Sequence, residues 1–122
     1  MVRRILLATL AAVLLYVGYG LYNVNDNWRR DAIVWAAASG NGPQIVSLLA
    51  EGASPSQVGW EEHLTPQGAA SATGHVTIVR LLLDSCANVN ERDDSRTTAL
   101  TYAKRRNLKR IAAMLIAAGG HE

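Results

Sequence analysis

The chain has 122 residues, of which 49% are apolar and 18% charged, and its formal net charge is +2. This length suits one small domain, and a chain so apolar and so weakly charged is not intrinsically disordered. Cys86 is the single cysteine, so an internal disulfide is excluded. Ala and Leu dominate while aromatic residues make up only 6%, which predicts a thin core of small aliphatic side chains.

The first distinct segment is an uncharged apolar run over residues 5–22, which follows a short basic arm at residues 1–4. As a helix, 18 residues span about 27 Å, close to the hydrocarbon thickness of a bilayer. Near its far end lie three rings that suit the headgroup level, Tyr16, Tyr19 and Tyr22. The run predicts a single-pass transmembrane helix that acts as an uncleaved signal anchor. A cleavable signal peptide, with Gly18 and Gly20 near the cleavage point, is the alternative.

The charges flanking this run bear on its orientation. Two arginines and the terminal amine precede it, and two arginines follow it: Arg3, Arg4, Arg29 and Arg30. The positive-inside rule favours a cytoplasmic N-terminus and places the rest of the chain on the exported side, periplasmic or extracytoplasmic. Residues 23–30 are polar and rich in Asn, and they predict a short linker between the membrane and the domain. Trp28 in this linker is expected to be an interface or packing ring.

Beyond the linker, residues 31–122 repeat themselves. Residues 64–96 align with 97–120 at an offset of 33, which pairs Thr65 with Thr98, Gly74 with Asn107 and Cys86 with Gly119. The segment 31–63 aligns with the second at an offset of 34, which pairs Gly40 with Gly74 and Gly52 with Cys86. Such a period indicates a stacked array of three units in which each unit completes its core with its neighbours.

The second unit resembles the ankyrin repeat in nearly every signature position. The matching residues are Thr65-Pro66, Ala69-Ala70, Gly74-His75, Leu81-Leu82-Leu83 and Ala87-Asn88-Val89-Asn90. The resemblance covers about residues 31–120 and implies an all-α, helix-turn-helix solenoid of three repeats, here preceded by one transmembrane helix. Two departures stand out, since Gln67-Gly68 replaces the usual Leu-His and Cys86 replaces a Gly.

The residues themselves predict the same helices. Thr65 is a typical N-cap and Pro66 a typical first helical residue. The expected inner and outer helices pair 32–39 with 42–51, 67–73 with 76–85, and 99–105 with 108–118. Gly52 and Gly119 stand where a left-handed residue closes an outer helix. Cys86 at the equivalent place therefore needs a positive φ, at a cost of about 1 kcal/mol.

Residues that carry chemistry are scarce. The three histidines, His63, His75 and His121, do not lie at metal-ligand spacing from one another or from Cys86. Nucleotide-binding and nucleophile motifs are missing. We therefore expect no enzyme activity, no catalytic residue, no cofactor, no metal site and no small-molecule substrate. His75 is expected to hydrogen-bond the repeat turn.

The surface is more informative. The resemblance implies that the fingers between repeats, together with the inner helices, bind another protein. In the first finger, residues 55–63, Trp60 is the expected apolar anchor; the alternative is that its ring folds back over the first unit. An acidic rim is expected from Glu61, Glu62, Glu91, Asp93 and Asp94, and further partner contacts from Gln57, His63 and Trp35. For Trp35, packing against the linker is the favoured alternative.

A basic cluster marks the third unit, formed by Lys104, Arg105, Arg106, Lys109 and Arg110. Its main interpretation is a solvated face that caps the end of the array. Anionic lipid is an alternative partner for it. Nucleic acid is not expected, because a flat basic stripe interleaved with aromatic residues is missing.

Together these features predict a membrane-tethered protein-protein interaction module that binds a partner and either inhibits or scaffolds it. One specific version is an immunity or inhibitor protein for an exported toxin or enzyme. The alternative function is a structural accessory subunit of a membrane complex, held by the lipid-embedded helix 5–22. In that case small residues allow another helix to approach closely: Ala8, Ala11, Ala12, Gly18 and Gly20.

Overall fold

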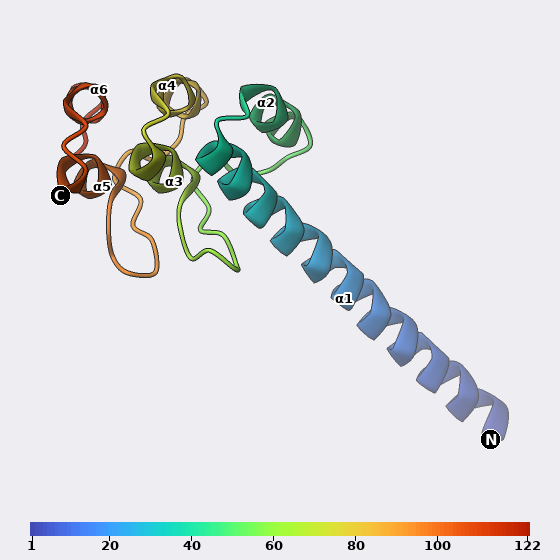
Figure 1. Ribbon diagram of the computed structural model, residues 1–122. Helices are drawn as coiled ribbons and strands as arrows, with labels where there is room; N and C mark the ends of the chain where they lie inside the picture. Colours follow the sequence, from blue (N-terminus) through green and yellow to red (C-terminus); the bar gives the residue numbers. More distant parts are fainter.

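The computed structural model describes the backbone of residues 1–122 and the side chains of all residues except 22–25. Over this backbone the regular secondary structure is helical, as the repeat pattern predicts. The helices are α1 (Val2–Ser39), α2 (Gly42–Ala50), α3 (Pro66–Thr73), α4 (Val76–Asp84), α5 (Ala99–Arg105) and α6 (Lys109–Ala117). The end of α1 forms an inner layer with α3 and α5, while α2, α4 and α6 form the outer layer (Figure 1).

The helix starts follow from local chemistry. The Thr65 hydroxyl accepts a hydrogen bond of 2.9 Å from the Gly68 N–H, and Pro66 opens α3. In the next unit the Thr98 hydroxyl accepts in the same way from the Thr101 N–H. Each cap satisfies a backbone donor that the first helical turn leaves free. The predicted Thr65 cap is therefore confirmed, and the aligned Thr98 acts in the same way.

Left-handed backbone recurs at fixed places in the repeats. Gly40, Gly74 and Asn107, which are equivalent by alignment, close the inner helices with φ of 75°, 81° and 57°. A second set, Gly52, Cys86 and Gly119, has φ of 94°, 62° and 91°. The prediction of a positive φ for Cys86 is thus confirmed. The fingers add a third place, where His63 and Arg96 have φ of 55° and 59° at a separation of 33 residues.

The core runs continuously through the stack, from Ile33 in the first unit through Leu82 in the second to Leu115 in the third. His75 joins the first two units. Its Nε2–H donates a hydrogen bond of 2.9 Å to the carbonyl oxygen of Ala38, near the end of α1. The histidine does bond a repeat turn, as expected, but the turn belongs to the preceding unit.

The first helix is longer than the sequence predicts. The expected linker, residues 23–30, shows no break, because α1 continues from Val2 to Ser39 and supplies the first inner helix of the array. An ion pair of 2.8 Å between Asp26 and Arg30, one turn apart, supports helix in this stretch. Trp28 is exposed, so the expected packing of its ring against the domain is wrong.

The apolar part of α1 stands clear of the array. Among the described residues, α1 is the one helix long and apolar enough to cross a membrane, and its most apolar window is not buried in the protein. A signal sequence would meet the same criterion. Tyr16 and Tyr19 are exposed, whereas the side chain of Tyr22 lies outside the described residues.

Candidate protein-binding surface

The first finger is held against α1. The Glu61 N–H donates a hydrogen bond of 3.0 Å to the Asp31 carboxylate, and the Gly59 N–H closes the finger by donating to the Leu64 carbonyl at 2.9 Å. A methyl group added to Gly59 would lie 3.1 Å from both Asp31 and Val34. Glycine at this position therefore lets the finger approach the helix closely. The backbone on both sides of Trp60 is fixed by these contacts.

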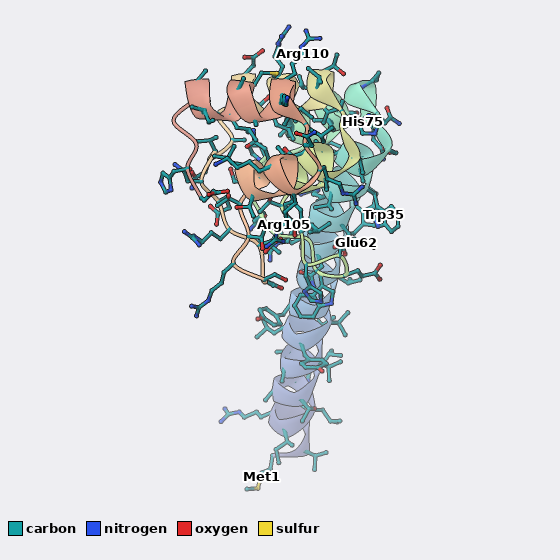
Figure 2. All side chains as sticks on the ribbon, turned by 60° about the vertical axis from the view of Figure 1, so that its left-hand side comes forward. Met1, Trp35, Glu62, His75, Arg105 and Arg110 are labelled. Carbon is teal, nitrogen blue, oxygen red and sulfur yellow. The ribbon has the colours of Figure 1, made fainter. Side chains whose placement is uncertain are left out.

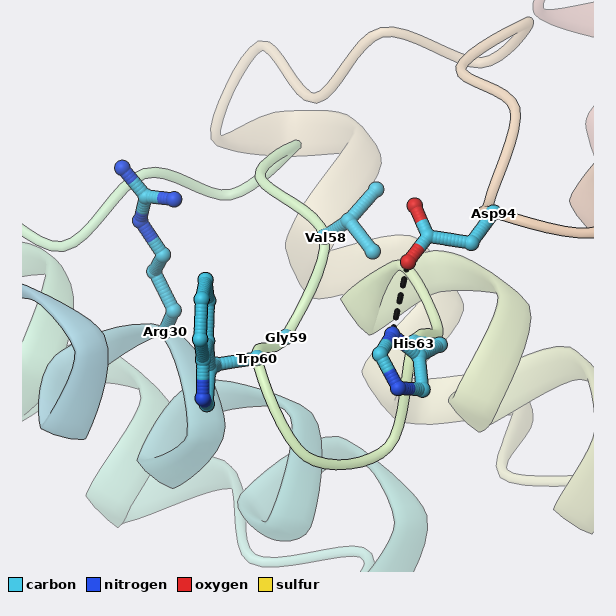
Figure 3. A pocket seen from close by; sticks show the side chains of 6 residues that line it. All are labelled: Arg30, Val58, Gly59, Trp60, His63 and Asp94. Atoms are coloured by element: carbon cyan, nitrogen blue, oxygen red, sulfur yellow. Dashed lines mark hydrogen bonds and ion pairs between the residues drawn. The ribbon is translucent and has the colours of Figure 1, made fainter.

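Trp60 projects from this finger with 65% of its surface exposed, so its ring does not fold back over the first unit. It lines an open pocket of about 400 Å³ with five other residues: Arg30, Val58, Gly59, His63 and Asp94 (Figure 3). Trp60, His63 and Asp94 are predicted site residues, and Val58 and Gly59 lie within the predicted finger 55–63. The sequence does not predict Arg30, because only the continuation of α1 brings this residue beside the finger.

The first finger is joined to the second finger, which spans residues 88–97. His63 Nδ1 lies 2.6 Å from a carboxylate oxygen of Asp94 (Figure 3), and the Asp94 N–H donates to the His63 carbonyl at 3.3 Å. At the base of the fingers, the Asn88 N–H donates to the Ser56 hydroxyl at 2.8 Å. A surface held in this way loses little conformational entropy when a partner binds.

Asp93 does not belong to the exposed rim. It is only 4% exposed, and one carboxylate oxygen accepts hydrogen bonds of 2.9 Å from the N–H groups of Ser95 and Thr97. The Tyr102 hydroxyl donates to the other oxygen. Burial and the bond to this carboxylate raise the pKa of Tyr102 to about 12. Asp93 therefore shapes the second finger from within, and the expectation that it contacts a partner is wrong.

The remaining acidic residues divide by exposure. Glu61, Glu62 and Asp94 are exposed and stand near Trp60 along the fingers. Glu91 is half-buried, and its carboxylate accepts a hydrogen bond of 3.1 Å from the Asn88 side chain. Gln57 is half-buried as well. The exposed acidic rim is thus smaller than predicted and is concentrated beside Trp60.

Trp35 and the basic cluster lie away from the fingers. Trp35 is more than half exposed at the edge of the molecule far from α5, so the favoured expectation that it packs against the linker is wrong (Figure 2). All five residues of the basic cluster, 104–106 and 109–110, are exposed around the turn between α5 and α6. Lys104 forms an ion pair of 3.4 Å with Glu122. The structure therefore has two separate charged surfaces, which are the acidic rim beside Trp60 and the basic cluster.

Metal-ligand geometry does not arise in the described part of the chain, where no three His, Cys, Asp or Glu side chains gather to hold an ion. The arrangement offers instead a rigid, partly apolar surface with exposed charge, which is suited to protein recognition.

Comparison with known proteins agrees with this architecture. A family model described as ankyrin repeats (3 copies) matches residues 33–122. A comparison with curated proteins returns no match. Ankyrin repeats are typically protein-interaction domains without enzymatic activity. The chain belongs to the ankyrin-repeat family, and its repeats form a protein-protein interaction module.

Proposed function

We propose that the protein is a membrane-tethered interaction module that binds another protein through its joined fingers, with Trp60 as the apolar anchor. The observation that carries this proposal is the exposed indole on a finger whose backbone is fixed to α1 on one side and to the second finger on the other. Exposed tryptophans on rigid surfaces are enriched among the residues that dominate binding energy.

The tether itself is supported by the length, composition and isolation of the apolar part of α1. The fingers and this part of α1 lie on the same side of the helical layers (Figures 1 and 2). With residues 5–22 in a bilayer, the fingers therefore point toward the membrane surface. The flanking arginines favour a cytoplasmic N-terminus and an exported array. The partner then carries its binding segment close to that surface.

The charge around Trp60 indicates which kind of partner segment binds there. Glu61, Glu62 and Asp94 surround Trp60 with exposed carboxylates, which repel anionic lipid headgroups and attract a basic segment of a protein. We therefore propose a partner with a basic, partly apolar stretch next to the membrane. Binding there would either mask the activity of the partner or hold it in place.

The membrane part is tested on the full chain. Membranes are washed with carbonate, and the N-terminus of the retained protein is sequenced. Retention with Met1 or Val2 at the N-terminus supports the tether. Release by the wash, or an N-terminus at Leu21, contradicts it.

The binding part is tested by affinity purification of the full chain from membranes in mild detergent, followed by mass spectrometry. Proteins that are retained by the natural sequence and lost with Trp60→Ala are partners of the finger surface. Val46→Ala is the matched control, because Val46 is also an exposed apolar residue but lies on the outer helix α2. Retention of all partners by Trp60→Ala would favour the accessory-subunit alternative, in which α1 makes the contacts.

A further inference from the structure

One face of α1 carries a seven-residue repeat from the apolar run into the array. Large residues recur at every seventh position: Leu7, Leu14, Leu21, Trp28 and Trp35. Small residues stand four places after a large one, namely Ala11, Gly18, Ala32 and Ser39. The remaining place in this small series is Asn25, whose side chain lies outside the described residues. In coiled-coil notation the small residues occupy a and the large ones occupy d. We call this face the seam.

Ala32 is half-buried against the core of the array, but the large side chains of the described part of the seam are exposed. Its five large side chains are between 55% and 67% exposed, although the same helix buries Ile33, Val34 and Ala37 in the array. A methyl group added to Gly18 would meet nothing within 4 Å. The seam is therefore open both in the apolar run and beside the repeats.

The position of Trp35 in its repeat explains why its side chain is exposed. Its equivalents are Ala69 and Tyr102, and the Tyr102 ring lies 3.4 Å from a methyl group added to Gly68 of the preceding unit. This repeat position thus faces the preceding unit, which the first repeat lacks. In the outer layer, Ile78 and Leu81 face Gly42 in the same way, and their equivalents in the first unit are the polar Gln44 and Ser47. The first unit therefore presents polar residues at the free end of the outer layer, but it presents Trp35 at the free end of the inner layer.

Lipid does not account for Trp35. It stands 13 residues beyond residue 22, about 20 Å along a helix. The headgroup region of one leaflet is only about 6 Å deep. With residues 5–22 in the hydrocarbon, Trp35 lies in water beyond the lipid. Any surface that covers Trp35 is therefore that of a protein.

We infer that this face binds a second copy of the same chain, forming a parallel dimer along α1. The inference rests on the proposed membrane placement in one respect, that all copies then share one orientation and present the seam at the same depth. Each large residue then meets its own equivalent and packs beside the small residues of the other helix. In lipid no hydrophobic force drives two helices together. Association depends instead on close packing, which small residues allow.

The size of the seam suits such a dimer. Five large side chains in each copy, each losing on the order of 100 Å² of exposed surface, bury about 1,000 Å² in total. A specific interface begins at about this area. Finger 55–63 contacts α1 through Asp31 and Val34, which lie beside the seam and do not belong to it.

Disulfide cross-linking of the full chain in membranes tests the dimer. In a Cys86→Ser background, single cysteines replace Leu21 or Trp28 in the seam and, as the control, Tyr16, which faces away from it in the seven-residue repeat. Tyr16 is 80% exposed, more than either Leu21 or Trp28, so random collisions favour the control. On oxidation with copper phenanthroline we expect a band of twice the chain mass from Leu21→Cys and Trp28→Cys, and about ten times less from Tyr16→Cys. Equal yields, no band, or a band of another mass would overturn the inference.

Two glycines provide a second, matched test. Gly18 lies in the seam and Gly20 outside it, and both have open space around them. Added to the Trp28→Cys protein, Gly18→Ile should lower the dimer yield by about tenfold, while Gly20→Ile should leave it nearly unchanged. An equal loss from both, or no loss from Gly18→Ile, would contradict the inference. Carbonate washing of the same samples keeps the two proposals distinct, because a released but cross-linked dimer refutes the tether alone.

Discussion

The hydroxyl of Tyr102 donates a hydrogen bond of 2.5 Å to the buried carboxylate of Asp93 and so fastens the second finger to α5. The other oxygen of the same carboxylate accepts hydrogen bonds from two backbone N–H groups of the finger, those of Ser95 and Thr97. Removal of the Tyr102 hydroxyl would leave the buried Asp93 carboxylate without one of its donors, which typically costs about 1–3 kcal/mol. The shape of this finger therefore depends on a residue nine positions away in the next helix.

Tyr102→Phe should consequently lower the free energy of unfolding, and the difference from the natural sequence should shrink at high pH. The pKa of Tyr102 is about 12 in the folded protein against an ordinary 10.0, so its contribution is complete below pH 10 and is lost as the pH rises toward 12. Urea unfolding at about pH 9 and about pH 11 measures this change. A difference that stays constant over this range would contradict the assignment.

Gln67→Leu should stabilise the array. Gln67 is only 3% exposed, and neither polar atom of its amide has a hydrogen-bond partner among the described residues. Its equivalents in the other units are the buried apolar residues Ile33 and Leu100. We expect the free energy of unfolding to rise by about 1–3 kcal/mol, as measured by thermal or urea unfolding. Gln44→Leu on the exposed face of α2 is the control and should change little. Destabilisation by Gln67→Leu would show that the amide has a partner.

Cys86→Gly should also stabilise, because glycine adopts the φ of 62° found here without a steric penalty. The expected gain in the free energy of unfolding is about 1 kcal/mol. Cys86→Ala is the matched control, since it removes the exposed thiol but retains the strained backbone, and it should leave stability nearly unchanged. An equal gain from both variants would trace the effect to the thiol instead.

Reversal of the charge beside Trp60 should affect the rate of binding. Glu61→Lys combined with Glu62→Lys should slow association with a basic partner and weaken its dependence on salt, because exposed charges steer encounter more than they hold the complex. Surface plasmon resonance at two ionic strengths measures both effects. The basic end of the array would become the better candidate surface if association were faster in the double variant.

Much of the array could be predicted from sequence because its determinants are local. The Thr65 cap, the glycine closures and the strained Cys86 all follow from residue types at fixed positions in one unit. The course of residues 23–30 could not, since Asn and Asp are weak helix formers and the helix gains support from the Asp26–Arg30 pair and from packing further along.

The candidate surface was harder to predict because it joins segments far apart in the chain. Trp60 stands out by its type alone, but Asp93 resembles its neighbour Asp94 in sequence while the two lie on opposite sides of the finger surface. The one local clue is that Ser95 and Thr97 follow Asp93 at spacings from which their N–H groups reach its carboxylate. Only Tyr102, from the next unit, shows that this carboxylate is buried.

Because α1 is unbroken, its length sets the distance between the apolar run and the first finger. No Gly or Pro interrupts it between residues 21 and 39, and the Asp31–Glu61 bond sets the first finger nine residues beyond residue 22. With residues 5–22 in a bilayer, that is a height of about 14 Å above the hydrocarbon. One residue inserted between 22 and 28 would turn the whole array by about 100°, whereas seven would restore its facing and lift it by about 10 Å. Register along α1 thus determines both how far the fingers reach and which way they point.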